Sequence, residues 1–156
     1  MHPAVDRVTR VLRAAGATGE VRVLEAPART AAEAAAALGC EVGAIANSLV
    51  FTAGAEPVLV LTSGAHRVDP AAAGALLGVE RLGRAAPDLV RAATGTAIGG
   101  VAPVGHPTPL RTLVDVALGG HDVVWAAAGH PHAVFATSYE ELLRLTGGTP
   151  AEVAGE

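Results

Sequence analysis

Residues Pro57–Thr62 read PVLVLT, an uninterrupted apolar run that ends in a single threonine. A run of this length without polar alternation is typical of a strand buried on both faces of a sheet. It therefore predicts a sheet through the middle of the fold, with other elements packed against both of its faces.

The segments on either side predict further strands interleaved with helices. Three of the strands follow one another without a helix between them, which breaks the strict alternation of a doubly wound parallel sheet. We therefore predict an α+β fold with a mixed sheet, either open or closed. The expected strands are Val21–Leu24, Ser48–Thr52, Val79–Leu82, Leu113–Val116, Val123–Ala127 and Ala133–Ala136.

Capping signals set the ends of the expected helices. Thr30 and Glu33 have the spacing of a capping box, as do Ser138 and Glu141, and Asp69 precedes a proline at a first helical position. We expect one domain over residues 1–150 and a frayed tail over 151–156. The expected helices are Pro3–Ala15, Ala31–Leu38, Pro70 to Gly78, Pro87–Thr94 and Tyr139–Leu145, with a helical turn over Glu41–Ala46.

Composition excludes several function classes. The 156 residues include 35 alanines, 11 arginines, no lysine and 15 acidic residues, for a formal net charge of −4, and aromatic residues make up 3%. With few cations and few aromatic residues, such a chain is a poor candidate for binding long nucleic-acid duplexes or for stacking on single-stranded nucleic acid. One cysteine, Cys40, excludes a disulfide framework. Without a signal peptide or membrane-length apolar run, we expect a cytoplasmic protein, either a monomer or a weak dimer.

Residues Ala97–Gly105 read AIGGVAPVG, the most irregular stretch of the chain. Glycines let a backbone approach a ligand closely, and such a loop can direct N–H groups at an oxyanion. A plain connector has the same composition. The loop has neither the Gly-Lys-Ser/Thr of a Walker A motif nor the setting of a dinucleotide fingerprint.

Two other patterns allow chemistry. Asn47 and Ser48 interrupt an apolar strand, so they face solvent, a polar network or a ligand. His130 and His132 lie two residues apart, which puts them on one face of a strand, but no third metal ligand follows by spacing. We therefore expect no bound metal and no cofactor.

A nucleophilic site has weaker support. Ser48, several histidines and either Asp69 or Asp115 supply the residue types of a triad, without a Gly-x-Ser-x-Gly motif. His66 follows the buried strand, where α/β proteins often place site loops. His66 also fits a solvated loop. Cys40 fits a packing role, because no charged partner lies near it in sequence.

The order of several segments resembles the YbaK/ProX-type aminoacyl-tRNA deacylases, a family that includes the editing domain inserted in bacterial prolyl-tRNA synthetase. The resemblance covers Pro3 to Gly148. It is carried by Ile45–Phe51 (IANSLVF), Val58–Gly64 (VLVLTSG), Ala97–Pro103 (AIGGVAP), Ala128–Phe135 (AGHPHAVF) and Glu140–Leu143 (EELL).

The resemblance implies a barrel-like curved sheet surrounded by helices, and hydrolysis of the ester between a wrong amino acid and a tRNA. The implied substrate is a small amino acid, such as Cys or Ala, on tRNA for proline. The implied partners are the tRNA acceptor end and prolyl-tRNA synthetase. We expect no membrane partner.

The resemblance also implies site residues. The family's Gly-x-x-x-Pro loop matches Gly99, Gly100, Val101, Ala102 and Pro103, whose backbone would hold the aminoacyl group and the attacking water. This matches the chemistry, because preorganised N–H groups stabilise the charge of an ester-hydrolysis transition state. The implied substrate-binding residues are Asn47, Ser48, Thr62, Gly64, Arg67 and His130, the last limiting the size of the pocket.

One position departs from the family. Its characteristic lysine, in the pattern Ile-x-Lys-Ser-Leu-x-Phe, falls at Asn47, which can donate a hydrogen bond but carries no charge. A bond to a charged group contributes roughly 1.5–3 kcal/mol, against about 0.5–1.5 for a neutral one. We expect weaker binding or slower turnover, with Arg67 as a substitute charge.

Two other functions stay open. A non-catalytic module that binds an aminoacyl-adenosine, a tRNA end or a protein partner is consistent with Asn47. A metal hydrolase would use His130 and His132.

Overall fold

A computed structural model of the chain describes residues 2–28, 30–96 and 98–154. The helices are α1 (Pro3–Ala14), α2 (Ala31–Leu38), α3 (Pro70–Leu76), α4 (Pro87–Thr94) and α5 (Tyr139–Thr146), with 3-10 turns η1 (Val42–Ala44) and η2 (Val116–Gly120). The strands are β1 (Val21–Val23), β2 (Ile45–Ala53), β3 (Glu56–Ser63), β4 (Gly83–Arg84), β5 (Arg111–Asp115), β6 (Val124–His130), β7 (Ala133–Thr137) and β8 (Thr149–Ala151).

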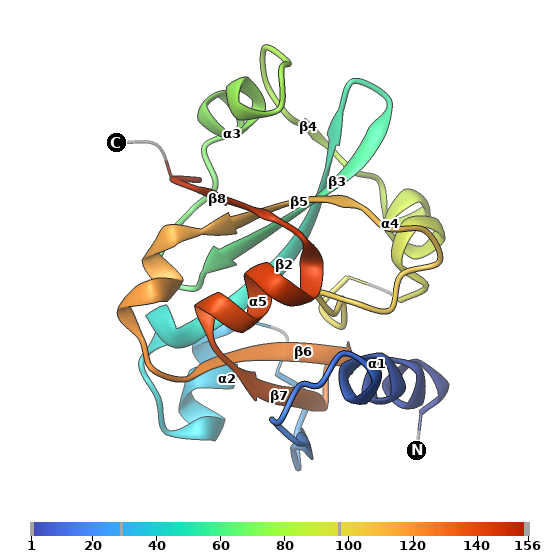
Figure 1. Cartoon of the computed structure of the whole chain (residues 1–156), viewed down its shortest axis with the longest axis vertical. Helices are drawn as coiled ribbons and strands as arrows, with labels where there is room; N and C mark the ends of the chain where they lie inside the picture. Colours follow the sequence, from blue (N-terminus) through green and yellow to red (C-terminus); the bar gives the residue numbers. More distant parts are fainter. Residues whose placement is uncertain (1, 29, 97, 155–156) are drawn as a thin grey trace.

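Within the described residues, the eight strands form one mixed sheet in the order β1-β7-β6-β2-β3-β5-β8, with β4 paired to β2. The pairs β2–β6, β3–β5 and β5–β8 are parallel, and the others are antiparallel. Figure 1 shows that the sheet curls and that helices surround it. The predicted α+β fold with a curved, barrel-like sheet is confirmed.

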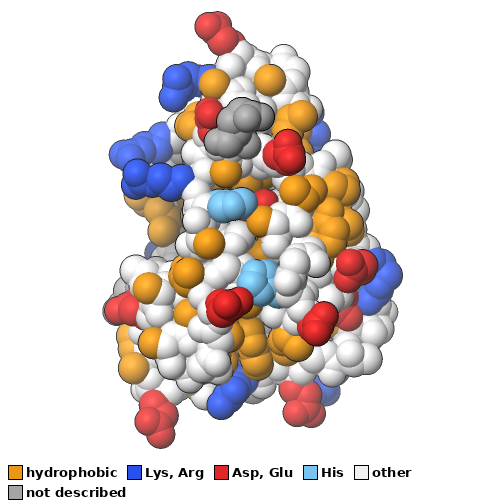
Figure 2. All heavy atoms as spheres, turned by 90° about the vertical axis from the view of Figure 1, so that its left-hand side faces the viewer, with side chains coloured by type: hydrophobic (Ala, Val, Ile, Leu, Met, Phe, Trp, Pro, Cys, Tyr) orange, Lys and Arg blue, Asp and Glu red, His pale blue; other side chains and the backbone are white. Residues whose placement is uncertain are grey.

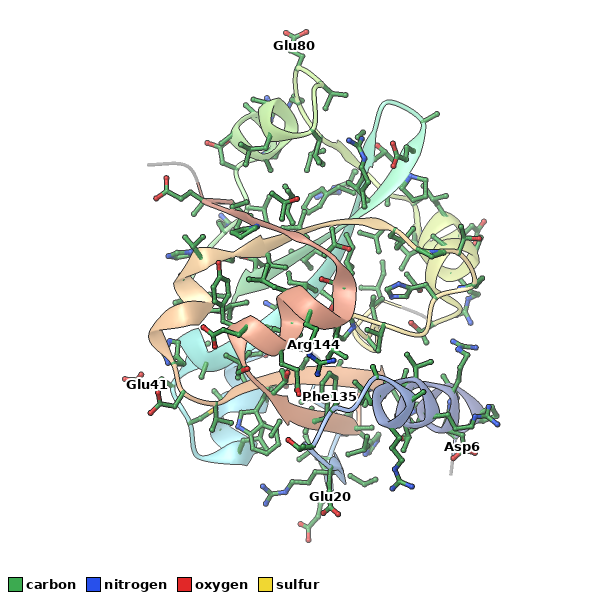
Figure 3. The ribbon with its side chains drawn as sticks, viewed as in Figure 1. Asp6, Glu20, Glu41, Glu80, Phe135 and Arg144 are labelled. Carbon is green, nitrogen blue, oxygen red and sulfur yellow. The ribbon has the colours of Figure 1, made fainter. Side chains whose placement is uncertain are left out.

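The central strand of this sheet is β3. It lies between β2 and β5, and its residues Val58–Leu61 are fully buried. Leu59 and Leu61 belong to a large core with Phe135, whereas Val58 and Val60 face a smaller core under α3. The strand is therefore buried on both faces, as the PVLVLT pattern predicts. Figure 3 shows Phe135 inside the molecule, while Asp6, Glu20, Glu41 and Glu80 lie at its periphery.

Local capping forms as predicted at three helices. Thr30 and Glu33 complete the capping box of α2, and the Ser138 side chain accepts a hydrogen bond from the Glu141 N–H. The Asp69 carboxylate accepts from the first N–H groups of α3. No helix of the described chain is long and apolar enough to span a membrane.

The strand predicted at Val79–Leu82 is wrong, because α3 uses this segment for its own termination. The Val79 N–H bonds to the Gly74 carbonyl, and a Cβ on Gly74 would lie 2.7 Å from the Arg81 Cα. The strand begins later in the chain, after the contact between Gly74 and Arg81. It is β4, in which Gly83 and Arg84 pair with Thr52 and Phe51 of β2.

The expectation of a frayed tail is also wrong for the part that the structure describes. β8 crosses residue 150 and pairs with the end of β5. Val153 is fully buried, and its carbonyl accepts a hydrogen bond from the Asp69 N–H over 2.7 Å. A backbone ladder and an apolar anchor fix this segment. Residues 155–156 of the predicted tail lie outside the described residues.

Candidate aminoacyl-binding pocket

A cavity of about 290 Å³ lies between α2 and one face of the sheet. We call it the α2 pocket. Small and apolar side chains form most of its wall, and Thr30, Asn47 and Ser48 supply the polar ones among the described residues. The wall comprises Ala28, Thr30, Ala31, Ala34, Ile45, Ala46, Asn47, Ser48, Leu49, Ile98, Gly99, Val101, Trp125, Ala127 and Val134.

Strand register explains why these residues share one wall. Alternate residues of a strand point to the same face, so Asn47 lies on the face of Ile45 and Leu49. Ile45 is the partner of Trp125 on β6, and Ala127 is the partner of Val134 on β7. These residues form one continuous face of β2, β6 and β7, whereas Ala46 and Ser48, which also line the cavity, are on the opposite face of β2.

The glycine-proline loop, Gly99–Pro103, forms one side of the pocket with its first half. Ile98, Gly99 and Val101 line the cavity. Because glycine has no side chain, it is the backbone of Gly99 that faces the cavity. Ala97, the first residue of the irregular stretch, lies outside the described residues.

Hydrogen-bonding capacity is left over in this half of the loop. Among the described residues, the N–H groups of Gly99, Gly100 and Val101 form no hydrogen bond. Buried amides normally have partners, so unbonded amides beside a cavity are available to a ligand.

The second half of the loop lies away from the pocket. Ala102 is buried in the large core, whereas Val101, between the two halves, belongs to this core and also lines the pocket. Pro103 instead lines a separate cavity of about 170 Å³ together with His106 and Leu110. The loop thus passes through the core from one cavity to the other.

The Ser48 hydroxyl is a second unused polar group at the α2 pocket. Its oxygen is buried and has no hydrogen-bond partner among the described residues. Ser48 lies on the opposite face of β2 from Asn47, so the two polar residues reach the cavity from different sides of the strand. A ligand at this point would satisfy an oxygen that the protein leaves unpaired.

Comparisons with known proteins agree with this arrangement. The family model described as an aminoacyl-tRNA editing domain matches residues 25–145, which include every described residue of the pocket wall. The chain belongs to the aminoacyl-tRNA editing domain family. A solved structure described as a candidate trans-editing enzyme for prolyl tRNA synthetase has a TM-score of 0.93 and 44% identity, and covers 100% of this chain and 99% of the other.

Two further proteins are similar to this editing domain. The hypothetical protein APE2540 has a TM-score of 0.86 and 32% identity, over 94% of this chain and 98% of its own. A proline–tRNA ligase of Nitratidesulfovibrio vulgaris strain DP4 is 35% identical over 98 residues, which are 63% of this chain. The matched part is 17% of the ligase, so this chain spans only a small part of that curated relative.

Three residues predicted to bind substrate are not part of the pocket wall. Thr62 is the partner of Asn47 across β2 and β3, but its hydroxyl donates to the buried Asp115 carboxylate. Gly64 packs behind the pocket, where a Cβ would lie 2.7 Å from the Ala31 Cβ. Arg67 is exposed in the turn after β3.

His130 adjoins the loop through its backbone rather than lining the pocket. A Cβ on Gly100 would lie 3.0 Å from the His130 Cα. The His130 ring contacts those of His2 and His132 in tilted arrangements, with centroids 4.9 and 5.2 Å apart. Among the described residues, no group of three or more His, Cys, Asp or Glu side chains is arranged to hold a metal ion.

The other residues considered for catalysis lie elsewhere in the editing domain. His66 Nδ1 is 2.9 Å from the buried Asp115 carboxylate, which also accepts the Ser63 N–H, and Ser48 is not part of this cluster. Figure 2 shows histidine side chains next to acidic ones on the face at the left of Figure 1. Cys40 packs against the small core under α2, where burial raises the pKa of its thiol, so the reactive thiolate is disfavoured.

Sequence patterns alone did not identify several wall residues. Trp125 is the single tryptophan of the chain and lines the pocket. Ala31 and Ala34 are three residues apart in α2, which puts them on one side of the helix, and Ala28 precedes the helix with the same spacing in sequence. That spacing was the available signal, but alanines are so common in this chain that the pattern does not stand out.

Proposed function

We propose that this editing domain hydrolyses the ester between a small, wrongly attached amino acid and the 3′ end of a tRNA. The amino acid would be one such as Ala or Cys, on tRNA for proline. The observation that supports this most is the half-loop Ile98–Val101, which borders the cavity and in which the N–H groups of Gly99, Gly100 and Val101 form no hydrogen bond within the described part of the chain. The similar proline–tRNA ligase supports prolyl-tRNA synthetase as a partner, and a cytoplasmic site of action follows from the chemistry of translation.

The polar groups of the pocket are suited to ester hydrolysis without a protein nucleophile. The described wall contains no carboxylate, imidazole or cysteine side chain. A water molecule would attack the carbonyl carbon, and the N–H groups of the loop would stabilise the negative charge on the carbonyl oxygen. The C–O bond to the ribose then breaks, the ribose oxygen takes a proton, and free amino acid and tRNA leave. The neighbouring ribose hydroxyl of the tRNA would assist the water.

The size of the pocket supports a small amino acid. Its volume of about 290 Å³ is at the lower end of the range for small-molecule sites. Ala31, Ala34 and Ala127 leave space for one short side chain, whereas Ile45 and Trp125 limit its length. Asn47 would hold the ribose or the terminal phosphate by a neutral hydrogen bond.

The test is a deacylation assay with tRNA for proline charged with Ala, Cys or Ser. We expect release of at least one of these amino acids faster than uncatalysed hydrolysis, and slower release of proline. Release of all three at the uncatalysed rate would rule out the proposed activity.

Asn47 favours a second candidate, a module that binds a charged tRNA end without hydrolysing it. A non-hydrolysable alanyl-adenosine analogue would then bind in calorimetry while no charged tRNA is turned over. Binding of the analogue together with turnover of charged tRNA identifies an enzyme. A protein whose pocket takes another ligand is expected to show neither binding of the analogue nor turnover.

A further inference from the structure

His106 folds back onto the glycine-proline loop. Its Nε2 lies 2.7 Å from the Ala102 carbonyl oxygen. A carbonyl oxygen only accepts hydrogen bonds, so Nε2 carries the proton and donates it. The bond spans four residues and fixes the orientation of the peptide unit that joins Ala102 to Pro103.

The turn that brings His106 back is itself fixed by α1. Gly105 has a φ of +85°, and a Cβ there would be 3.4 Å from Val8 Cγ2 of the helix. Arg7 of α1 lies on the same side, with Nη2 3.5 Å from the Thr94 carbonyl at the end of α4. His106 therefore belongs to a packed support of the loop.

This support lies behind the loop, away from the α2 pocket. His106 and Pro103 line the smaller cavity, whereas Ile98, Gly99 and Val101 line the α2 pocket. None of the residues that the structure describes borders both cavities. His106 can affect a ligand in the α2 pocket only through the loop.

We propose that His106 is a positioning residue of the deacylase site, because its Nε2–H anchors the Ala102 carbonyl and so fixes the amides of Gly99 and Val101 toward the pocket. The inference rests on the proposed function. The proposal requires the hydrogen-bond donor of His106. A histidine that only fills space would not need this donor.

Two substitutions separate the donor from the volume. His106→Leu roughly keeps the volume of the side chain but removes the hydrogen-bond donor. In His106→Gln, the amide nitrogen can take the place of Nε2 as the donor. With alanyl-tRNA as substrate, we expect His106→Leu to lower kcat about tenfold, the effect of one lost hydrogen bond, with KM within about twofold. His106→Gln restores kcat to within about threefold of the wild type.

His121→Leu is the matched control. His121 is also a largely buried histidine, with its nearest carboxylate, Glu41, 3.7 Å away, but it does not contact the loop or the α2 pocket. We expect its kcat to stay at the wild-type value. Wild-type kcat for His106→Leu in a folded protein, or an equal loss in His106→Gln and His106→Leu, overturns the proposal.

A second measurement does not depend on turnover. Long-range ¹⁵N spectra of the wild type are expected to show His106 as the Nε2–H tautomer, and the Gly99 and Gly100 amide signals should shift in His106→Leu and return in His106→Gln. An Nδ1–H tautomer overturns the proposal even if His106→Leu does not fold. If wild-type protein shows these signals but no deacylation, the loop anchor stands and the proposed function fails.

Discussion

Gly100 and His130 are in backbone contact, since a Cβ on Gly100 would lie 3.0 Å from the His130 Cα and 3.2 Å from its nitrogen. The glycine-proline loop is thus seated directly on the end of β6. His130 and the loop were both predicted as parts of the site from separate stretches of sequence. Their contact is through main-chain atoms, which cannot move aside as a flexible side chain can.

Gly100→Ala should displace the loop. The added methyl group would press against the backbone of His130, and overpacking of this kind lowers the free energy of unfolding by roughly 1–3 kcal/mol. We expect a lower free energy of unfolding in urea and at least about a tenfold loss of kcat/KM for alanyl-tRNA, because catalytic geometry tolerates little displacement.

Gly120→Ala is the control for this substitution. A Cβ there meets no atom within 4 Å, and the backbone is not left-handed. Its stability and activity should equal those of the wild type. Equal effects of the two substitutions would show that the contact with His130 is unimportant.

Asn47→Lys should raise deacylation. Asn47 lies in the pocket wall, and the sequence resemblance implies that the family has a lysine at this position. A charged donor exceeds a neutral one by about 1–1.5 kcal/mol, which is roughly a five- to tenfold gain in kcat/KM. Asn47→Leu should lower the same quantity.

A lysine elsewhere on the surface controls for general attraction to tRNA. Ala32 of α2 is exposed and does not line the pocket, so Ala32→Lys adds the same charge outside the site. We expect less than a twofold change in kcat/KM. If Asn47→Lys changes activity no more than Ala32→Lys does, Asn47 does not have the assigned role.

Ala127→Val should narrow the pocket. Ala127 lines the pocket opposite its cross-strand partner Val134, and two added methyl groups take volume from a cavity of about 290 Å³. We expect KM for alanyl-tRNA to rise at least about fivefold, since one misplaced methylene costs about 1–3 kcal/mol in a binding pocket. Ala136→Val is the control, because Ala136, two residues from Val134 on β7, does not line the cavity; the same rise in KM there would mean that the effect does not come from the pocket.

Much of the fold could be predicted because its signals are local. The PVLVLT run and the capping pairs Thr30–Glu33 and Ser138–Glu141 depend on neighbouring residues alone. Val79–Leu82 failed as a strand because its hydrogen bonds go to α3, which no local pattern reveals. β8 was missed for the same reason, since Thr149–Ala151 is a strand only through its pairing with β5.

The site was predicted less completely than the fold. Asn47 and the first half of the glycine-proline loop meet at the pocket, whereas Thr62 and Gly64 lie behind it. Which residues face one cavity depends on the register of β2 with β6, a contact between distant parts of the chain. Trp125 lines the pocket because this register places it opposite Ile45.

Val153→Ala should destabilise the protein although it lies three residues from the C-terminal end of the sequence. Val153 is fully buried in the core under α3, so removing its two methyl groups costs about 2 kcal/mol of the free energy of unfolding. Val123 is 49% exposed, and Val123→Ala should cost less than about 0.5 kcal/mol. Equal costs in urea unfolding would mean that the C-terminal segment is not anchored.

Acid should weaken the protein through His106. Burial lowers the pKa of His106, the bond to the Ala102 carbonyl partly offsets this, and the nearby Arg7 lowers the pKa further. In the unfolded chain, the histidine has a pKa of about 6.5. As the pH falls through this value, the unfolded chain therefore binds more protons than the folded chain. Because stability rises with pH wherever the unfolded state binds more protons, stability should decrease on acidification and level off below the folded-state pKa.

His106→Gln isolates this contribution, since glutamine keeps a donor but does not titrate. Urea unfolding of both proteins at pH 7.5 and pH 5 should show a smaller loss of stability in the variant, and the difference between the two losses belongs to His106. Carboxylates and the other histidines are common to both proteins, so they cancel in this comparison. An equal loss in the two proteins would show that His106 is as easily protonated in the folded chain as in the unfolded one, contrary to its burial behind the loop.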